Sequence, residues 1–383
     1  MQDYTDVLIV GAGPTGLALA AELRRRGVSP AIVDQQELGA NTSRACVVHA
    51  RTMEVLEPLG ETAKLLALGL KVPIFRIRDR DRTLLTIDFS KIERPYPFTL
   101  MCPQDKIEQS LTAQLQELGG CVLRPCRLVR FEQRQTDVEA QVMSNDTVRA
   151  IRAKWLVGCD GIHSTVRDAS GIGFAGGAYE QEFVLADVRM QWPLSRAEVT
   201  LFYSPEGLVV VAPLPGDHFR IVATVDQAPE MLSLSYIQDV LNHRGPTDSP
   251  GLIHEVVWSS RFRIHHRVAT KLRQGRILLC GDAGHVHSPA GGQGMNTGIQ
   301  DGVSLGEALA TTLKDGDEAR LDAWAKERHR VASEVVKMTD RLTRVATIKS
   351  TFAQHFRNTA VALAGHIPQV RAAVAKKLAE LDA

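Results

Sequence analysis

Residues 6–16 read Asp-Val-Leu-Ile-Val-Gly-Ala-Gly-Pro-Thr-Gly, and this stretch decides the fold that the sequence predicts. A short apolar run, typical of a buried strand, leads into Gly11, Gly13 and Gly16 at the spacing Gly-x-Gly-x-x-Gly. In a dinucleotide-binding turn the first glycine allows a tight turn and the second lets the backbone approach a pyrophosphate. The third allows a helix to pack closely on the strand. The stretch therefore predicts a strand, a phosphate-binding turn and the start of a helix.

The residues after this turn complete a βαβ unit. Residues 17–26 have the pattern of an amphipathic helix, and the apolar run 31–33 ends at Asp34. An acid at the end of the second strand, eighteen residues after Gly16, is placed to accept hydrogen bonds from ribose hydroxyls. The complete pattern favours a nucleotide site, but by itself it does not separate FAD from NAD.

A second nucleotide motif lies near the other end of the chain. Residues 276–296 read Arg-Ile-Leu-Leu-Cys-Gly-Asp-Ala-Gly-His-Val-His-Ser-Pro-Ala-Gly-Gly-Gln-Gly-Met-Asn. An apolar strand ends at Gly281-Asp282, and a loop rich in Pro and Gly opens a helix at 294–296. The free N–H groups of a helix start stabilise an anion, and an aspartate can bind polyol hydroxyls. This combination favours a flavin, with Asp282 on the ribityl chain and the helix start at the N1–C2=O edge.

The composition is that of an ordinary globular protein. A chain of 383 residues exceeds what one hydrophobic core usually supports, so we expect two domains. A formal net charge of +1 speaks against a nucleic-acid-binding protein, and no apolar run reaches the roughly 20 residues of a membrane span. The first strand begins almost at once, so we expect no signal peptide and a cytoplasmic location. The six cysteines are scattered, and we expect no disulfides.

The order of the predicted elements indicates an α/β fold with a discontinuous nucleotide domain. Strand-like segments dominate from 183 to 268, whereas the α/β pattern returns after Arg276 and residues from Gly298 onward have a helical pattern. The two nucleotide motifs therefore bracket a mostly-β insertion, with a ligand cleft expected at the boundary. We expect a Rossmann-like nucleotide domain over 1–71, 100–180 and 269–345, a β-rich substrate domain over 72–99 and 181–268, and C-terminal helices over 346–383.

Four motifs in this order resemble one enzyme family along essentially the whole chain. They are the Gly11–Gly16 turn, the segment Ser43-Arg44-Ala45 with His49-Ala-Arg-Thr-Met-Glu54, the segment Asp160-Gly161 to Arg167, and Gly281-Asp282 to Asn296. The chain resembles the single-component FAD-dependent aromatic hydroxylases of the para-hydroxybenzoate hydroxylase type. The segment around Arg44 is most similar to the subgroup that acts on phenols and polycyclic aromatic polyketides. Many members of that subgroup carry a C-terminal thioredoxin-like domain, which we expect this chain to lack because it ends at Ala383.

The resemblance implies a role for particular residues. Arg44 would reach the FAD pyrophosphate or ribose, Gln104 would bind near the pyrophosphate or ribityl chain, and the backbone of Leu128 would hold the adenine. Asp160-Gly161 and Arg167 would serve both FAD and a transient NAD(P)H, and Pro289 would lie near the reactive flavin face. The implied cofactor-binding set is Gly11, Gly13, Thr15, Gly16, Asp34, Arg44, Gln104, Leu128, Asp160, Asp282, Pro289, Gly292, Gly294, Met295 and Asn296.

The resemblance also implies a reaction. FAD reduced by NADPH or NADH would trap O₂ as a flavin C4a-hydroperoxide, which would hydroxylate a small phenolic or polycyclic aromatic substrate. The flavin carries this chemistry, so no metal is needed, and the sequence identifies no general base. Both a monomer and a homodimer are compatible with the sequence.

Other functions compete with this interpretation. Baeyer–Villiger oxygenation could use the same scaffold, and a non-redox flavoprotein could cyclise or sequester an aromatic ligand. A halogenase is disfavoured because the four tryptophans are isolated, and a hydrolase because no Gly-x-Ser-x-Gly elbow is present. His285 and His287 could suggest a metal pair, but a structural role is favoured since no third ligand lies nearby. The amphipathic tail 352–381 could associate with a membrane, yet a helix packed on the FAD domain is the simpler interpretation.

Overall fold

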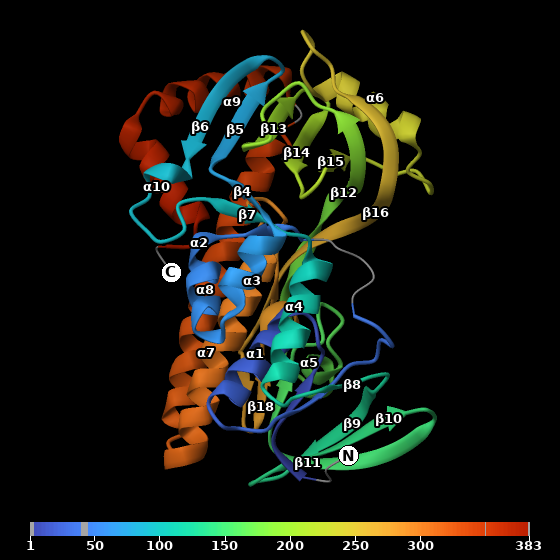
Figure 1. The fold of residues 1–383 in the computed structure, drawn as a ribbon, viewed down its shortest axis with the longest axis vertical. Coiled ribbons are helices and arrows are strands. Elements are labelled where there is room, and N and C mark those ends of the chain that lie inside the picture. Colours follow the sequence, from blue (N-terminus) through green and yellow to red (C-terminus); the bar gives the residue numbers. More distant parts are fainter. Residues whose placement is uncertain (1–3, 40–44, 349, 382–383) are drawn as a thin grey trace.

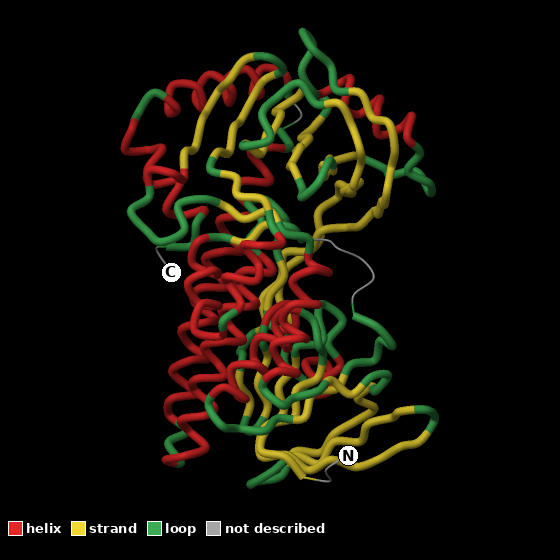
Figure 2. The backbone as a smooth tube through the Cα atoms, viewed as in Figure 1, coloured by secondary structure: helices red, strands yellow, loops and turns green. Residues whose placement is uncertain are grey.

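The computed structural model describes residues 4–39, 45–348 and 350–381, and its elements form two regions along the long axis of the molecule (Figure 1). Each region is built on an eight-stranded sheet, and a small three-stranded sheet joins the two regions. Figure 2 shows that long strands pass from one region to the other. This arrangement confirms the expected α/β class with a Rossmann-like FAD domain, a largely β insertion and a helical C-terminus.

The first sheet has a parallel core in the order β18-β11-β1-β2-β8, and β17 pairs antiparallel at its edge. The antiparallel strands β9 and β10 extend it through β11. Parallel strands covered on both faces are nearly continuous in apolar residues, as the runs at 7–10 and 277–279 are. The bounds are β1 (Tyr4–Val10), β2 (Ala31–Val33), β8 (Val122–Leu123), β9 (Arg127–Gln133), β10 (Val138–Ser144), β11 (Thr147–Gly158), β17 (Arg273–Gln274) and β18 (Ile277–Leu279).

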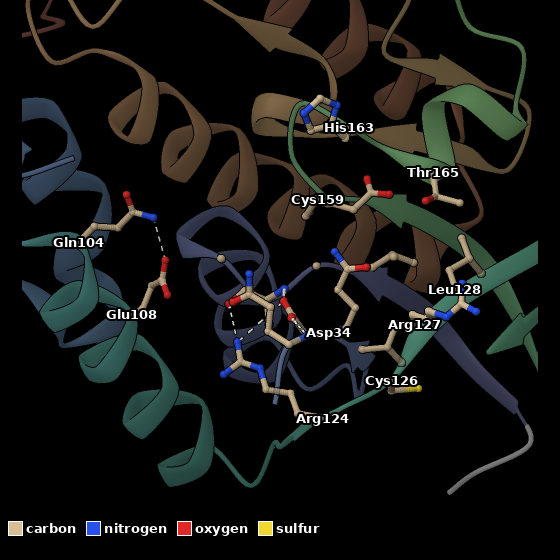
Figure 3. A pocket seen from close by; sticks show the side chains of 18 residues that line it. Asp34, Gln104, Glu108, Arg124, Cys126, Arg127, Leu128, Cys159, His163 and Thr165 are labelled. Carbon is tan, nitrogen blue, oxygen red and sulfur yellow. Dashed lines mark hydrogen bonds and ion pairs between the residues drawn. The ribbon is translucent and has the colours of Figure 1, made fainter. Parts of the chain in front are cut away.

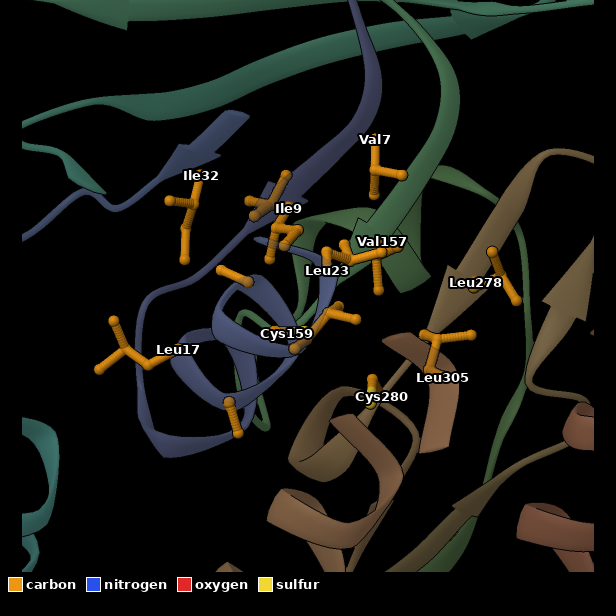
Figure 4. Packing of buried hydrophobic residues seen from close by; sticks show 14 of the residues in the cluster. Val7, Ile9, Leu17, Leu23, Ile32, Val157, Cys159, Leu278, Cys280 and Leu305 are labelled. Atoms are coloured by element: carbon orange, nitrogen blue, oxygen red, sulfur yellow. The ribbon is translucent and has the colours of Figure 1, made fainter. Parts of the chain in front are cut away.

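Helices α1 (Pro14–Arg25) and α7 (Gly294–Asp315) pack against each other beside this sheet. Gly298, Gly302 and Gly306 repeat every four residues and so lie on one side of α7. A Cβ at Gly302 would lie 2.6 Å from the carbonyl oxygen of Thr15. The two helices therefore approach more closely than any side chain on that stripe would allow. The core beneath them includes Leu17, Leu23, Val157, Leu278 and Leu305 (Figure 4).

The remaining helices of this region are α4, which contacts α1, and α5, α2 and α3, with short 3-10 turns between some of them. The small sheet β3-β7-β4 joins this region to the second one. The bounds are β3 (Val47–Val48), α2 (Ala50–Leu56), η1 (Glu57–Leu59), α3 (Glu61–Leu68), β4 (Leu70–Val72), β7 (Thr99–Met101), α4 (Gln104–Glu117), α5 (Thr165–Ala169) and η3 (Gly281–Ala283).

The second sheet has the order β19-β16-β12-β15-β14-β13-β5-β6 and is antiparallel except where β13 pairs with β5. Helix α6 packs on one of its faces over a cluster that includes Val184, Phe202 and Ile221. Sequence patterns did not predict α6, because it is a single helix amid strands. The bounds are β5 (Ile74–Asp79), β6 (Arg82–Asp88), η2 (Phe89–Lys91), β12 (Phe174–Gln191), β13 (Glu198–Ser204), β14 (Gly207–Pro213), β15 (His218–Val225), α6 (Leu234–Arg244), β16 (Leu252–Ala269) and β19 (His285–Val286).

The C-terminal part contains α8 (Ala319–Ala346), α9 (Thr351–Gly365) and α10 (Pro368–Leu378). Helix α9 packs on β6 of the second sheet, which corrects the expectation that the whole tail packs on the FAD domain. The residues at and after the end of α10 reach that domain, where the N–H of Arg51 donates to the carbonyl of Ala379. None of the helices in the described ranges combines the length and apolar composition that crossing a bilayer requires.

Candidate functional site

A cavity of about 440 Å³ opens at the carboxyl ends of β1, β2 and β11 (Figure 3). In parallel α/β sheets this edge is where ligands bind. Six residues of the predicted cofactor set line it, and they come from five separate stretches of the chain. They are Gly11, Gly13, Asp34, Gln104, Leu128 and Asp160.

The three glycines of the first motif meet different surroundings. Gly11 has a φ of +101°, and a Cβ there would lie 2.3 Å from the carbonyl oxygen of Cys159. A Cβ at Gly16 would lie 2.0 Å from the carbonyl oxygen of Gly11, so this position requires glycine for packing. A Cβ at Gly13 would meet nothing within 4 Å. The open space is therefore at Gly13, which also lines the cavity.

Asp34 is held at the cavity wall by backbone donors. The N–H groups of Ala12 and Gln36 donate to its two carboxylate oxygens at 2.7 and 2.8 Å. Arg124 lies 3.9 Å from the same carboxylate and donates to the carbonyl of Ala12 at 3.0 Å. Sequence reasoning did not identify Arg124, although a charged residue directly after the strand β8 was a usable signal.

Asp160 stabilises the turn that follows β11. Its carboxylate accepts hydrogen bonds from the Ser164 hydroxyl at 2.5 Å and the Val166 N–H at 3.1 Å. Burial raises the pKa of this carboxyl, and the Ser164 hydrogen bond opposes the rise. Arg167 points away from the cavity: it is buried over the Phe174 ring, and its guanidinium donates to the carbonyl of Ala283 at 3.3 Å. The structure thus makes Arg167 a link between the two Asp-containing turns.

The Gly281-Asp282 turn rests on a buried cluster of charged groups. Asp301 accepts hydrogen bonds from the Gly281 N–H at 3.3 Å, from His285 Nε2 at 2.6 Å and from Arg328 Nε at 2.5 Å. Burial opposes ionisation of Asp301, but Arg328 and His285 together hold its pKa below the usual range. His285 is therefore committed to a buried contact with Asp301. Among the described residues no three His, Cys, Asp or Glu side chains gather as metal ligands would.

The loop before α7 is fixed by contacts to the segment around β3. Gly292, with a φ of +68°, approaches Val47 so closely that a Cβ would lie 2.8 Å from it. The fully buried amide of Asn296 accepts from the N–H of His49 at 2.8 Å and donates to the carbonyls of Val47 and Gly292. The Asn296 side chain is used within the protein, so its backbone is the part available to a flavin. Pro289 and Asp282 are exposed beside this loop, while Gly294 and Met295 are half-buried.

Thr15 connects the two nucleotide motifs. Cβ atoms built at Gly281 and Gly298 would lie 2.6 and 2.5 Å from its hydroxyl oxygen. Two motifs more than 260 residues apart in sequence therefore meet at one helix start. Arg44 lies outside the described residues.

A buried ion pair lies where the second sheet approaches the segment around β3. Arg220 on β15 bonds the carboxylate of Asp187 on β12 through two nitrogens, at 2.7 and 2.8 Å. Its guanidinium also faces Cys46, whose thiol pKa burial raises and Arg220 lowers. Sequence reasoning missed this pair, although an arginine inside the apolar strand at 219–223 was a signal.

Comparison with known proteins decides the family. The sequence model of a family described as FAD binding domain matches residues 4–339. The chain belongs to this family of FAD-binding proteins. A protein of Bacillus subtilis named as an uncharacterized aromatic compound monooxygenase is 32% identical over 389 aligned positions, with 98% of this chain and 75% of the relative covered. The 6-methylpretetramide 4-monooxygenase of Streptomyces rimosus is 35% identical over 359 residues, with 92% of this chain and 64% of the relative covered.

Solved structures of similar fold agree with this assignment to the FAD-binding family. The p-nitrophenol 4-monooxygenase of Pseudomonas putida has a TM-score of 0.90 and covers 100% of this chain, with 99% of its own chain matched, but at 22% identity it shows the fold alone. An anhydrotetracycline hydroxylase of Streptomyces rimosus has a TM-score of 0.83 at 31% identity, with 99% of this chain and 76% of that chain covered. The FAD-binding chain thus spans less than two thirds of the 6-methylpretetramide enzyme and about three quarters of the anhydrotetracycline enzyme.

The residues present fit FAD. The cavity has open space beside the Gly13 backbone, and the Asp34 carboxylate, a hydrogen-bond acceptor of the kind that ribose hydroxyls bind, lines the same cavity. Thr15, in the first glycine motif, packs against Gly281 and against Gly298 of α7, so the second motif lies directly beside this cavity. FAD is the cofactor of this protein.

Proposed function

We propose that the protein is an FAD-dependent monooxygenase that uses NADPH or NADH and O₂ to oxygenate a phenolic or polycyclic aromatic substrate. The observation that carries the proposal is the meeting of the two nucleotide motifs at Thr15. This contact places the nucleotide-binding cavity beside the start of α7, and that helix start faces the inserted sheet domain. Bound FAD supplies the oxygen activation and accepts electrons from the nicotinamide cofactor.

The chain's own residues would bind FAD and orient it. Gly13 and Asp34 would hold the nucleotide half of FAD, and Asp282 would accept hydrogen bonds from the ribityl hydroxyls. The N–H groups at the start of α7, at Gly294 and Met295, would stabilise negative charge at the edge of the ring. Pro289 would cover the reacting face.

An apolar cluster lies where the second sheet meets the segment around β3. It includes Cys46 and, from the second sheet, Phe75, Val199 and Ala212, all buried, and the Arg220–Asp187 ion pair lies beside it. Aromatic ligands are bound by such surfaces, while a few polar groups set their orientation. Arg220 would orient a phenolic oxygen, since its charge favours hydrogen-bond acceptors.

The relatives support the polycyclic substrate class. One is named for the oxygenation of 6-methylpretetramide and another for that of anhydrotetracycline, and each is at least 31% identical to this chain. A substrate with several fused rings therefore ranks first, and simple phenols follow.

A second candidate is a non-redox activity on an aromatic or polyene ligand. The Diels-Alderase of pyrroindomycin biosynthesis has the same fold, with a TM-score of 0.83 at 25% identity. This relative indicates that the scaffold can serve a cyclisation. Baeyer–Villiger oxygenation is a third outcome, because it differs from hydroxylation only in where the oxygen enters.

The test is nicotinamide oxidation by the FAD-loaded protein against a panel of phenols and fused-ring phenols, with products analysed by mass spectrometry. Substrate-stimulated oxidation with a product heavier by one oxygen atom supports the proposal, and the structure of that product separates a phenol from an ester. Conversion of a ligand without nicotinamide oxidation or added oxygen would instead establish the non-redox activity.

A further inference from the structure

The C-terminal part of the chain has an unusual charge distribution. Between Arg341 and Ala379 the sequence contains no aspartate or glutamate but seven lysines and arginines. The chain as a whole is nearly neutral, with 45 basic and 44 acidic residues. Arg357 of α9 is buried, and Arg344 at the end of α8 pairs with Asp340 at 2.8 Å. The exposed positive charge therefore lies mainly on Arg341 near the end of α8 and on Lys376 and Lys377 of α10.

Helix α9 lies in this segment with its polar side facing inward. Gln354, Arg357 and Asn358 are 4%, 5% and 9% exposed, whereas Phe352, Phe356 and Leu363 are 85%, 70% and 65% exposed. At 100° per residue these three apolar side chains fall within one narrow arc of the helix. A helix on the surface of a globular protein normally turns its apolar side to the core. The first two turns of α9 have the reverse orientation, whereas Val361 and Ala362 further along pack on buried apolar clusters.

Specific contacts fix this reversed orientation. Gln354 donates to the carbonyls of Pro205 and Ile348, at 3.2 and 2.6 Å. Asn358 donates to the carboxylate of Asp79 at 2.9 Å. The Arg357 guanidinium lies 4.5 Å from the centre of the Tyr203 ring. Rotating α9 to bury its phenylalanines would leave these polar groups without partners. The contacts of α9 with the rest of the protein therefore hold the apolar row outward.

The end of α8 extends the exposed apolar surface. Arg357 donates to the carbonyls of Val345 and Ala346, both at 3.2 Å, which places the last turn of α8 against α9. Leu342 and Val345 on that turn are exposed, as is Ile367 after α9. The exposed cations Lys376 and Lys377 follow on α10.

We propose that this surface, Leu342 and Val345 with the outer row of α9, docks on an anionic lipid membrane. Outward aromatic and aliphatic side chains beside exposed basic residues are what a helix lying in a membrane interface requires. A second copy of the chain is a poor occupant, because a twofold interface would bring this cationic surface against itself. Docking holds the second sheet beside the lipid and involves no spanning segment. The inference does not depend on the proposed reaction.

The test is sedimentation of the FAD-loaded protein with vesicles of phosphatidylcholine alone or with added phosphatidylglycerol. We expect binding to the anionic vesicles only, and its loss at about 1 M salt, where the screening length falls to roughly 3 Å. The variant Phe352→Ser/Phe356→Ser should partition at least about tenfold more weakly. The variant Lys376→Gln/Lys377→Gln should lose about fivefold per charge.

Matched controls separate this surface from general effects. Met231→Ser removes an apolar side chain that is 81% exposed on another part of the second region, and Lys314→Gln removes an exposed charge in the last turn of α7, outside the segment. Both should bind vesicles as the unmodified protein does. Because Phe352 and Phe356 are exposed, the serine variant should keep its thermal stability and flavin absorbance. Absence of binding to anionic vesicles at low salt, or equal binding by the serine variant, would overturn the proposal. So would concentration-dependent dimerisation that the serine variant abolishes.

Discussion

Replacing Gly13 by alanine tests whether the open space beside it belongs to the cofactor. Gly13 has φ −75° and ψ −176°, an extended conformation that alanine adopts without strain, and its Cβ would meet nothing within 4 Å. The FAD-free variant should therefore match the unmodified protein in free energy of unfolding to within about 1 kcal/mol. If the pyrophosphate occupies that space, the added methyl group costs about 1–3 kcal/mol of binding free energy. That is a roughly 5- to 150-fold increase in the Kd for FAD.

Gly16→Ala is the matched control. Its Cβ would lie 2.0 Å from the carbonyl oxygen of Gly11, so the backbone must shift, and the FAD-free protein should lose about 3 kcal/mol or more of stability. The assays are titration of the FAD-free protein with FAD, followed by flavin fluorescence, and urea unfolding without FAD. Unchanged FAD affinity in Gly13→Ala, or loss of FAD-free stability equal to that of Gly16→Ala, would refute the assignment of this space to the pyrophosphate.

Three further predictions concern the framework of the site. Asp301→Asn should lower the free energy of unfolding by about 3–5 kcal/mol in urea titrations, since it leaves Arg328 and His285 without their buried anion. Asp315 is exposed, so the control Asp315→Asn should change the free energy of unfolding little. An equally small change in Asp301→Asn would contradict the prediction. Burial raises the pKa of Glu380 to about 8 from an ordinary 4.5, so the folded state binds the extra proton and stability should fall as pH rises between these values, then level off. Glu380→Gln should flatten that pH dependence, and identical pH profiles would exclude the carboxyl as its source. Gly302→Val should lower stability and FAD affinity together, because its side chain would meet the carbonyl of Thr15; retained stability in thermal melts would argue against tight packing of α1 on α7.

Local sequence patterns predicted the fold class and the parts of the site that depend on backbone geometry. The apolar run before Gly11 and the acid at Asp34 have periodicities and spacings that only a βαβ unit satisfies, and the structure places both at one cavity. The amphipathic helix predicted over residues 17–26 is observed as α1, Pro14–Arg25. Here local propensity and tertiary structure agree.

The sequence could not predict features that depend on long-range packing. Arg124 reaches Asp34 because the two-residue strand β8 pairs with β2, a register that no local pattern sets. The Asn296 side chain, expected near the flavin, is used instead to hold the backbone around β3. The reversed orientation of α9 was also hidden, since an amphipathic pattern does not state which side faces inward.

The joint between α1 and α7 sets the order in which the protein can be completed during synthesis. Strand β1 is made before its neighbour β11 in the sheet's core, and β11 is made before its own partner β18 (Ile277–Leu279). At about 5–20 residues per second, roughly 15 to 60 s separate the emergence of the first glycine turn from that of α7. The inserted sheet emerges within that interval. During this time α1 still lacks α7, whose glycine stripe packs on it. The glycine turn that emerges first therefore gains its α7 partner only after the inserted sheet has been made.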